Sequence, residues 1–179
     1  METTIASIAA LAIAAIAAIA DRRTGEIANW ITLPPAAIAP FLYAFFLGSH
    51  YGLLSVASLF LCSFVPYGLF RQGAMGGGDV KLFAALGAVT GFDISAGIEI
   101  ELAASIVALV IAFGALAWKG VLIRTLCNVV RLSFRRLSSS FPQPVTDLEL
   151  LTPVRMGGPI LIGTALVVLP YLSLHSVLG

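Results

Sequence analysis

Charged residues are scarce in this sequence. Only 11% of its 179 residues are charged, whereas 59% are hydrophobic, and the net charge is +1. Soluble domains carry roughly 25% charged residues, so the composition excludes an ordinary soluble domain. Basic and aromatic residues do not form the combined stripe on which nucleic-acid bases stack. We therefore expect no nucleic-acid partner.

Cysteine and histidine are equally scarce. Of the two cysteines, Cys62 lies in an apolar run and Cys127 in a basic polar segment, and no CxxC pair exists. A zinc knuckle is excluded because it needs more cysteine and histidine ligands, at closer spacing, than these two cysteines supply. We expect no metal site, although two carboxylates without a histidine remain a weak alternative, and no other cofactor.

Long apolar runs dominate the chain. A run of about 20 apolar residues crosses the hydrocarbon core of a bilayer as a helix, and these runs lack the alternation of membrane β-barrel strands. The sequence therefore predicts an all-α, polytopic membrane helix bundle of about six transmembrane helices, which forms one domain over residues 1–179. The predicted helices cover residues 3–20, 31–48, 52–70, 79–92, 98–118 and 159–177.

The basic residues predict the orientation of the bundle. If the chain crosses the membrane six times with both termini outside, all ten Lys and Arg residues fall on one side. The positive-inside rule makes this side the cytoplasm, so we expect a multi-pass protein of the bacterial inner membrane. Residues 119–156 then form a cytoplasmic segment. Its first part, residues 119–136, is predicted to be a basic amphipathic helix on the inner membrane surface.

A glycine run precedes an acidic residue at the start of the fourth predicted helix. Gly76, Gly77 and Gly78 leave the backbone free to bend and let another chain come close. Asp79 is expected to open the helix, where free N–H groups and the helix dipole favour an anion. Locally, the pattern is equally typical of an aspartate that merely caps a helix.

A second aspartate is expected on the same face of the membrane. Asp21 follows the first apolar run, which carries a face of small residues that lets it approach the fourth helix closely; these are Ala10, Ala14, Ala17 and Ala18. Two carboxyls held together share one proton, so one activates a water while the other protonates a scissile carbonyl. The simpler alternative for Asp21 is a charge that extends to the headgroup layer at a helix end.

Other catalytic sets are disfavoured by topology, because His50 and His175 are both predicted at the outer face. Lys81 lies two residues after Asp79, and positions i and i+2 of a helix do not face each other. We therefore expect Lys81 to extend to the headgroup layer rather than pair with Asp79. A Cβ atom at Gly78 is expected to crowd the Asp79 carboxylate.

The longer motif resembles a known family. Gly76-Gly77-Gly78-Asp79 fits GxGD, and Gly-Gly-Gly-Asp-Val-Lys-Leu, together with Asp21 in the first loop and six spans, is similar to the type IV prepilin peptidase family. The resemblance implies an aspartic endopeptidase with Asp21 and Asp79 as catalytic residues. It also implies that Gly76, Gly77, Gly78, Lys81 and Asn29 contribute to the substrate-binding loops.

Two departures from that family are visible. The first loop reads Ile27-Ala28-Asn29, where relatives often have Ile-Pro-Asn, and residues 155–159 read Arg-Met-Gly-Gly-Pro, where relatives tend to carry Arg followed by Pro, an aromatic and Gly. The chain also lacks the CxxC-containing insert of larger members, and it resembles the short, Flp (tight-adherence) form. Expected partners are prepilins or pseudopilins, the lipid bilayer, and pilus assembly or type II secretion machinery.

Two other functions remain open from the residues alone. A non-catalytic membrane scaffold would tolerate the loss of both carboxylates. A small transporter with a carboxylate proton relay would be expected to show paired broken helices in related halves, and the sequence has no such repeat. Removal of a leader peptide from a co-expressed prepilin distinguishes the peptidase from both.

Overall fold

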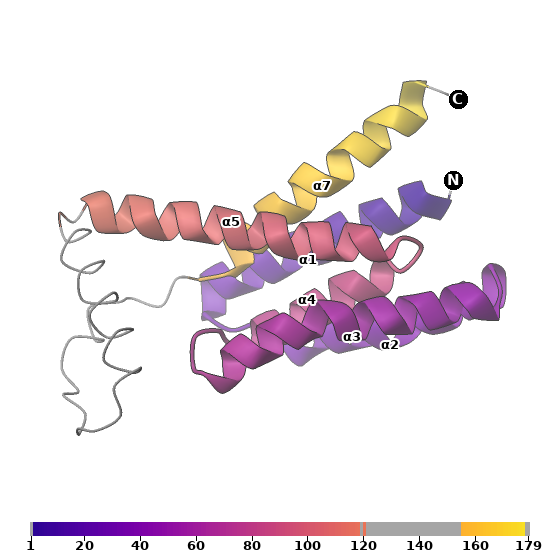
Figure 1. Ribbon diagram of the computed structural model, residues 1–179, viewed down its shortest axis with the longest axis horizontal. Helices are drawn as coiled ribbons and strands as arrows, with labels where there is room; N and C mark the ends of the chain where they lie inside the picture. Colours follow the sequence, from indigo (N-terminus) through magenta and orange to yellow (C-terminus); the bar gives the residue numbers. More distant parts are fainter. Residues whose placement is uncertain (1, 119, 121–154, 178–179) are drawn as a thin grey trace, which may run out of the picture. The chain divides into compact units, whose positions relative to one another are not determined.

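The regular elements of the computed structural model are all helices within the residues that it describes, which are 2–118, 120 and 155–177 (Figure 1). The predicted all-α class is therefore confirmed. The helices are α1 (Glu2–Thr24), α2 (Asn29–Phe46), α3 (Ser49–Arg71), α4 (Gly77–Val89), α5 (Ile94–Trp118) and α7 (Gly157–Val177). The predicted amphipathic helix at 119–136, Cys127 and most of the cytoplasmic segment lie outside the described residues.

Three of these helices are long and apolar enough to cross a membrane: α1 from Thr3 onward, α3 and α5. Helix α7 is apolar over Gly157–Pro170 at least, and α4 is the shortest of the six. With a rise of 1.5 Å per residue, the 13 residues of α4 extend only about 20 Å, which is less than the roughly 30 Å of a bilayer core. The described residues thus contain the expected number of helices, of which these three meet the length and hydropathy of a membrane span.

Contacts divide the chain into two units, Met1–Val107 with Arg155–Gly179, and Ala108–Val154. In the first unit α4 is the central helix, because it packs against α1, α2 and α3, and seven of its 13 residues are buried. Helix α1 packs against α7 more extensively than against α4. The alanine face of the first helix, which was expected to approach the fourth helix, is buried, but α7 and not α4 is the main partner of α1.

Small residues bring the backbones of α3 and α4 together. A Cβ atom at Gly87 would lie 2.7 Å from the Ser58 carbonyl oxygen and 2.9 Å from the Cys62 Cβ, and one at Gly91 would lie 2.3 Å from the Ser55 Cα. The Ser55 hydroxyl donates to the Ala88 carbonyl at 2.6 Å. Close approach through Gly and Ser is how helices associate where lipid removes the hydrophobic driving force.

The ends of two helices differ from the prediction in a way that matters for the acidic residues. Helix α1 does not stop at Ala20 but continues to Thr24 and ends at Gly25, whose φ of +75° is the left-handed conformation that glycine adopts readily. Asp21 is therefore inside the last turn of α1, not in a loop. Helix α4 begins at Gly77, so Asp79 is its third residue and not its first.

We predict that Gly87→Ala destabilises the protein, because the added methyl group meets the α3 backbone, which cannot move aside as a side chain would. Overpacking of this kind costs about 1–3 kcal/mol. Thermal unfolding in detergent measures the effect. Gly68→Ala is the matched control, since a Cβ atom there meets nothing within 4 Å. An equal change in both variants would contradict the close packing of α3 on α4.

Candidate active site

The turn after α3 directs the chain into the glycine run. Gly73 has φ of +73°, its N–H donates to the Phe70 carbonyl at 2.9 Å, and the N–H of Ala74 donates to the Leu69 carbonyl at 2.9 Å. This is the paired hydrogen-bond pattern of a Schellman motif, in which glycine supplies the left-handed residue that ends a helix. The chain then reaches Gly76, the N-cap of α4, after only two more residues.

Asp79 lies in the first turn of α4, outside the three helices long enough to span a membrane. It is the third helical residue, and the backbone N–H of the N-cap Gly76 donates to its carboxylate, as in half of a capping box. Burial and, secondly, the negative charge of Asp21 raise the pKa of Asp79 to about 6, while the Gly76 hydrogen bond lowers it. Asp21 is thus close enough to Asp79 to oppose its ionisation.

Asp21 is buried at the other side of the same site, with 6% of its surface exposed. Its Oδ2 atom accepts a hydrogen bond of 3.0 Å from the backbone N–H of Gly157, the first residue of α7. Unpaired N–H groups and the positive end of the dipole at a helix start favour a carboxylate in this place. Asp21 is therefore held by a helix that lies 136 residues later in the sequence.

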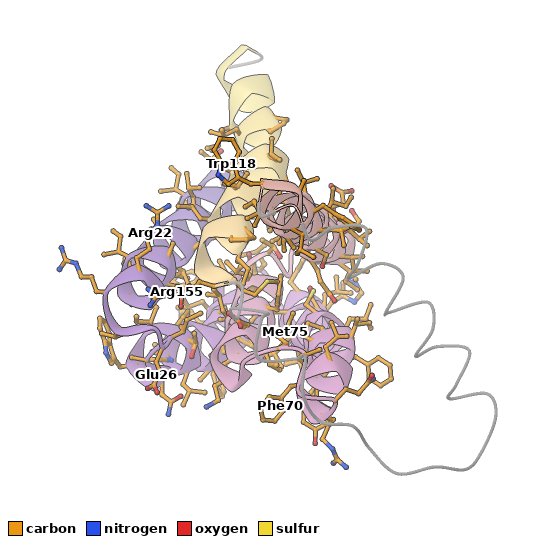
Figure 2. The ribbon with its side chains drawn as sticks, turned by 90° about the vertical axis from the view of Figure 1, so that its left-hand side faces the viewer. Arg22, Glu26, Phe70, Met75, Trp118 and Arg155 are labelled. Carbon is orange, nitrogen blue, oxygen red and sulfur yellow. The ribbon has the colours of Figure 1, made fainter. Side chains whose placement is uncertain are left out.

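Arg155 joins the same two helix ends. Its Nη1 atom donates to the backbone carbonyls of Asp21, at 3.1 Å, and Arg22, at 2.9 Å. These carbonyls belong to the last turn of α1, where the Asp21 carbonyl also accepts a hydrogen bond of 2.9 Å from the Gly25 N–H. Figure 2 looks at this end of the molecule and labels Arg155 and Arg22.

A polar cavity of about 380 Å³ separates the end of α1 from the start of α4. It brings together every residue that the sequence singled out for the site, and adds the loop residues that connect α1 to α2. The lining residues are Asp21, Gly25, Glu26, Ile27, Asn29, Gly76, Gly77, Gly78, Asp79 and Lys81. Within the described residues, no group of three or more His, Cys, Asp or Glu side chains has the arrangement of a metal site.

Lys81 has a partner that the sequence did not predict. Its Nζ atom donates to the Asn29 Oδ1 atom at 2.8 Å, and both residues line the cavity. The expectation that Lys81 does not pair with Asp79 agrees with this arrangement. The expectation that it extends toward headgroups does not, because helical geometry alone does not reveal that the first loop, 52 residues earlier, lies within reach.

The reason for glycine at position 78 also differs from the prediction. A Cβ atom there would lie 3.0 Å from the Cβ atom of Ile27 in the first loop, rather than against Asp79. It is Gly76 whose Cβ atom would lie 3.0 Å from the Asp79 Oδ2 atom. Gly78 therefore lets the first loop approach the start of α4, and Gly76 leaves room for the carboxylate.

Five residues of this region were not assigned to the site from the sequence: Gly25, Glu26, Ile27, Arg155 and Gly157. Glu26 and Ile27 lie in the loop between α1 and α2, so their closeness in sequence to Asp21 and Asn29 was the available signal. The run Arg155-Met156-Gly157-Gly158-Pro159 was visible as a departure from a family pattern, but its contact with Asp21 is tertiary and has no local signature.

Comparison with known proteins gives one match. The model of the type IV leader peptidase family matches residues 8–127, which include Asp21 and Asp79 and end before α7. No curated protein and no solved structure matches the chain.

We predict that Asp21→Asn lowers the pKa of Asp79, because it removes a nearby negative charge that opposes ionisation. The pKa should remain above the usual aspartate value, since burial is the larger cause. Carbon-13 NMR of labelled aspartate carboxyls, followed through a pH titration, measures it. Glu26→Gln removes another carboxylate from the same cavity and should have less effect. A larger shift in Glu26→Gln than in Asp21→Asn would show that the wrong pair is coupled.

Proposed function

The chain belongs to the type IV leader peptidase family, and we propose that it is a membrane-embedded aspartic endopeptidase in which Asp21 and Asp79 are the catalytic residues. Its proposed substrates are type IV prepilins or pseudopilins of the Flp kind, from which it removes the leader peptide at the cytoplasmic face of the membrane. The family match supports a leader peptidase in general terms. The mechanism, the kind of pilus and the side of cleavage are the further steps of the proposal.

The observation that carries this proposal is the pair of carboxyls around one polar cavity. Asp21 approaches from the last turn of α1 and Asp79 from the first turn of α4. The charge of Asp21 contributes to the raised pKa of Asp79, which is the electrostatic behaviour that lets such a pair hold one proton in common. Hydrolysis by two carboxyls requires one ionised and one protonated member at the same time.

The reaction proceeds without a covalent enzyme intermediate. The ionised carboxylate takes a proton from a water molecule, whose oxygen forms a bond to the scissile carbonyl carbon, while the protonated carboxyl gives its proton to the carbonyl oxygen. The carboxyl that took the proton of the water then gives it to the amide nitrogen, a hydroxyl of the resulting gem-diol returns its proton to the other carboxylate, the C–N bond breaks, and a carboxylic acid and an amine leave. One proton on the pair is restored for the next cycle.

The glycine run and the first loop are proposed to receive the substrate backbone. Gly76, Gly77 and Gly78 line the cavity with main chain, and an extended peptide is proposed to lie in the cavity next to Asp79. The hydrogen bond between Lys81 and Asn29 ties the first loop to α4 across the cavity. In this proposal the two residues hold the cavity walls at the separation that a single peptide strand needs.

An apolar hollow supports the idea that the substrate's own helix lies among these helices. It has a volume of about 700 Å³ and lies between α1 and α2, with Val89 of α4 as a further wall. The same two helices carry Asp21 and Asn29 at the polar cavity. A prepilin helix in this hollow would therefore lead its leader junction toward the two carboxyls.

The proposal places the protein in the bacterial inner membrane, with the polar cavity toward the cytoplasm. Arg22, Arg23, Arg71, Lys81 and Arg155 all lie at or near the helix ends that surround this cavity, and positive charge favours the cytoplasmic side. Its proposed partners are the prepilin, the surrounding lipid, and the pilus assembly or type II secretion machinery that uses the processed subunit.

We predict that Asp21→Asn and Asp79→Asn each abolish leader removal, because an amide can neither take nor give the proton. The loss should be at least about 1000-fold, and the double variant should be little worse than either single one, since the pair acts as a unit. Cleavage of a co-expressed prepilin, followed as a shift in its size at matched enzyme levels, measures this. Substantial processing by either single variant would exclude the two-carboxyl mechanism.

The sidedness of the cavity is tested by thiol labelling. In a background with Cys62→Ser and Cys127→Ser, a cysteine at Gln72 marks the cavity end of α3 and a cysteine at His50 marks its other end. We expect a membrane-impermeant maleimide to label His50→Cys in intact spheroplasts, and Gln72→Cys only after lysis. The reverse pattern would place the carboxyls on the periplasmic side.

A further inference from the structure

The start of α7 takes no part in the two-carboxyl reaction, yet its first backbone N–H binds the Asp21 carboxylate. The N–H of Gly157 donates to the Asp21 Oδ2 atom at 3.0 Å. A Cβ atom on Gly157 would lie 2.8 Å from both the Cβ and Oδ2 atoms of Asp21, and 3.1 Å from the Cα atom of Ala18. The backbone of α7 therefore approaches α1 so closely at this point that only glycine fits.

Arg155 keeps this approach in place. The two carbonyls that its guanidinium binds belong to Asp21 itself and to Arg22, so the side chain holds the main chain on which the Asp21 carboxylate is carried. Only Met156 separates Arg155 from Gly157. Residues 155–157 thus bind both the backbone and the side chain of Asp21. A planar guanidinium with several donors is better suited than a single ammonium to binding two carbonyl groups at once.

We propose that Arg155 and Gly157 are positioning residues for Asp21: together they fix its Oδ2 atom on the start of α7 and leave its Oδ1 atom to hold the attacking water. This inference rests on the proposed peptidase function. It assigns a role in that reaction to a part of the chain beyond the family match, which ends at residue 127. Neither residue touches the substrate in this arrangement, so each acts on the chemical step and not on substrate binding.

Steady-state cleavage of a prepilin by the full-length protein in proteoliposomes tests the role of Arg155. We expect Arg155→Gln to lower kcat by about 10- to 100-fold, as a small misplacement of a catalytic group does, with KM within about twofold of the wild type. Arg155→Lys should recover part of the rate, because one ammonium can still reach a carbonyl. Arg23→Gln is the matched control. It also removes one positive charge, but from an exposed side chain in the last turn of α1, the turn that contains Asp21.

Three results would overturn the role of Arg155. The first is an unchanged kcat in Arg155→Gln, and the second is a raised KM in that variant with unchanged kcat. The third is an equal loss of kcat in Arg23→Gln, which would indicate that the loss of positive charge alone lowers the rate. Gly157→Ala should likewise lose activity, whereas Gly158→Ala should retain it, because a Cβ atom on Gly158 meets nothing within 4 Å. Loss of activity in both glycine variants would equally contradict the proposal.

A readout without catalysis separates this inference from the proposed function. In detergent micelles, the Gly157 amide should exchange its hydrogen slowly in the wild type, faster in Asp21→Ala, and at the wild-type rate in Asp79→Ala. If the Gly157 amide shows this exchange pattern but no prepilin is cleaved, the proposed peptidase function is refuted and the contact between Gly157 and Asp21 is supported. If cleavage occurs and Asp21→Ala leaves the exchange unchanged, the peptidase function stands and the positioning role is refuted.

Discussion

Burial of the Asp21 carboxylate is the constraint on which this end of the bundle depends. A carboxylate withdrawn from water loses hydration that must be replaced by hydrogen-bond donors or a compensating charge. At 6% exposure Asp21 has little contact with solvent, and the donor comes from the first N–H of α7. This hydrogen bond brings the start of α7 so close to α1 that only glycine fits at position 157.

The Asp79 carboxylate is stabilised in a different way. It sits in the first turn of its own helix and reaches back to the N-cap N–H, so the start of α4 supplies its donor locally. The glycines that surround it are needed for space more than for flexibility, since Gly76 makes room for the carboxylate and Gly78 for the first loop. One carboxyl is thus fixed by tertiary contact and the other by local sequence, and the cavity lies where the two meet.

This difference explains how far the sequence could predict the site. Asp79 and its glycines form a compact motif, and the apolar runs predicted six helices whose order and approximate bounds agree with the structure. The position of Asp21 beside Asp79 could be expected from membrane depth. The contacts of Arg155 and Gly157 could not, because 133 to 136 residues separate them from their partners. The Lys81–Asn29 hydrogen bond was missed for the same reason, since helix periodicity describes neighbours on one helix and not the loop opposite.

The close packing of α3 on α4 also makes the reactivity of the Cys62 thiol a measure of whether these helices are in contact. Cys62 is only 1% exposed, and Gly87 and Gly97 have no room for a Cβ atom against it. An alkylating reagent cannot reach such a thiol while these helices remain in contact, so its reaction must wait for them to separate. In a Cys127→Ser background, the alkylation rate of Cys62 therefore reports how often the bundle opens next to α4, the helix that carries Asp79.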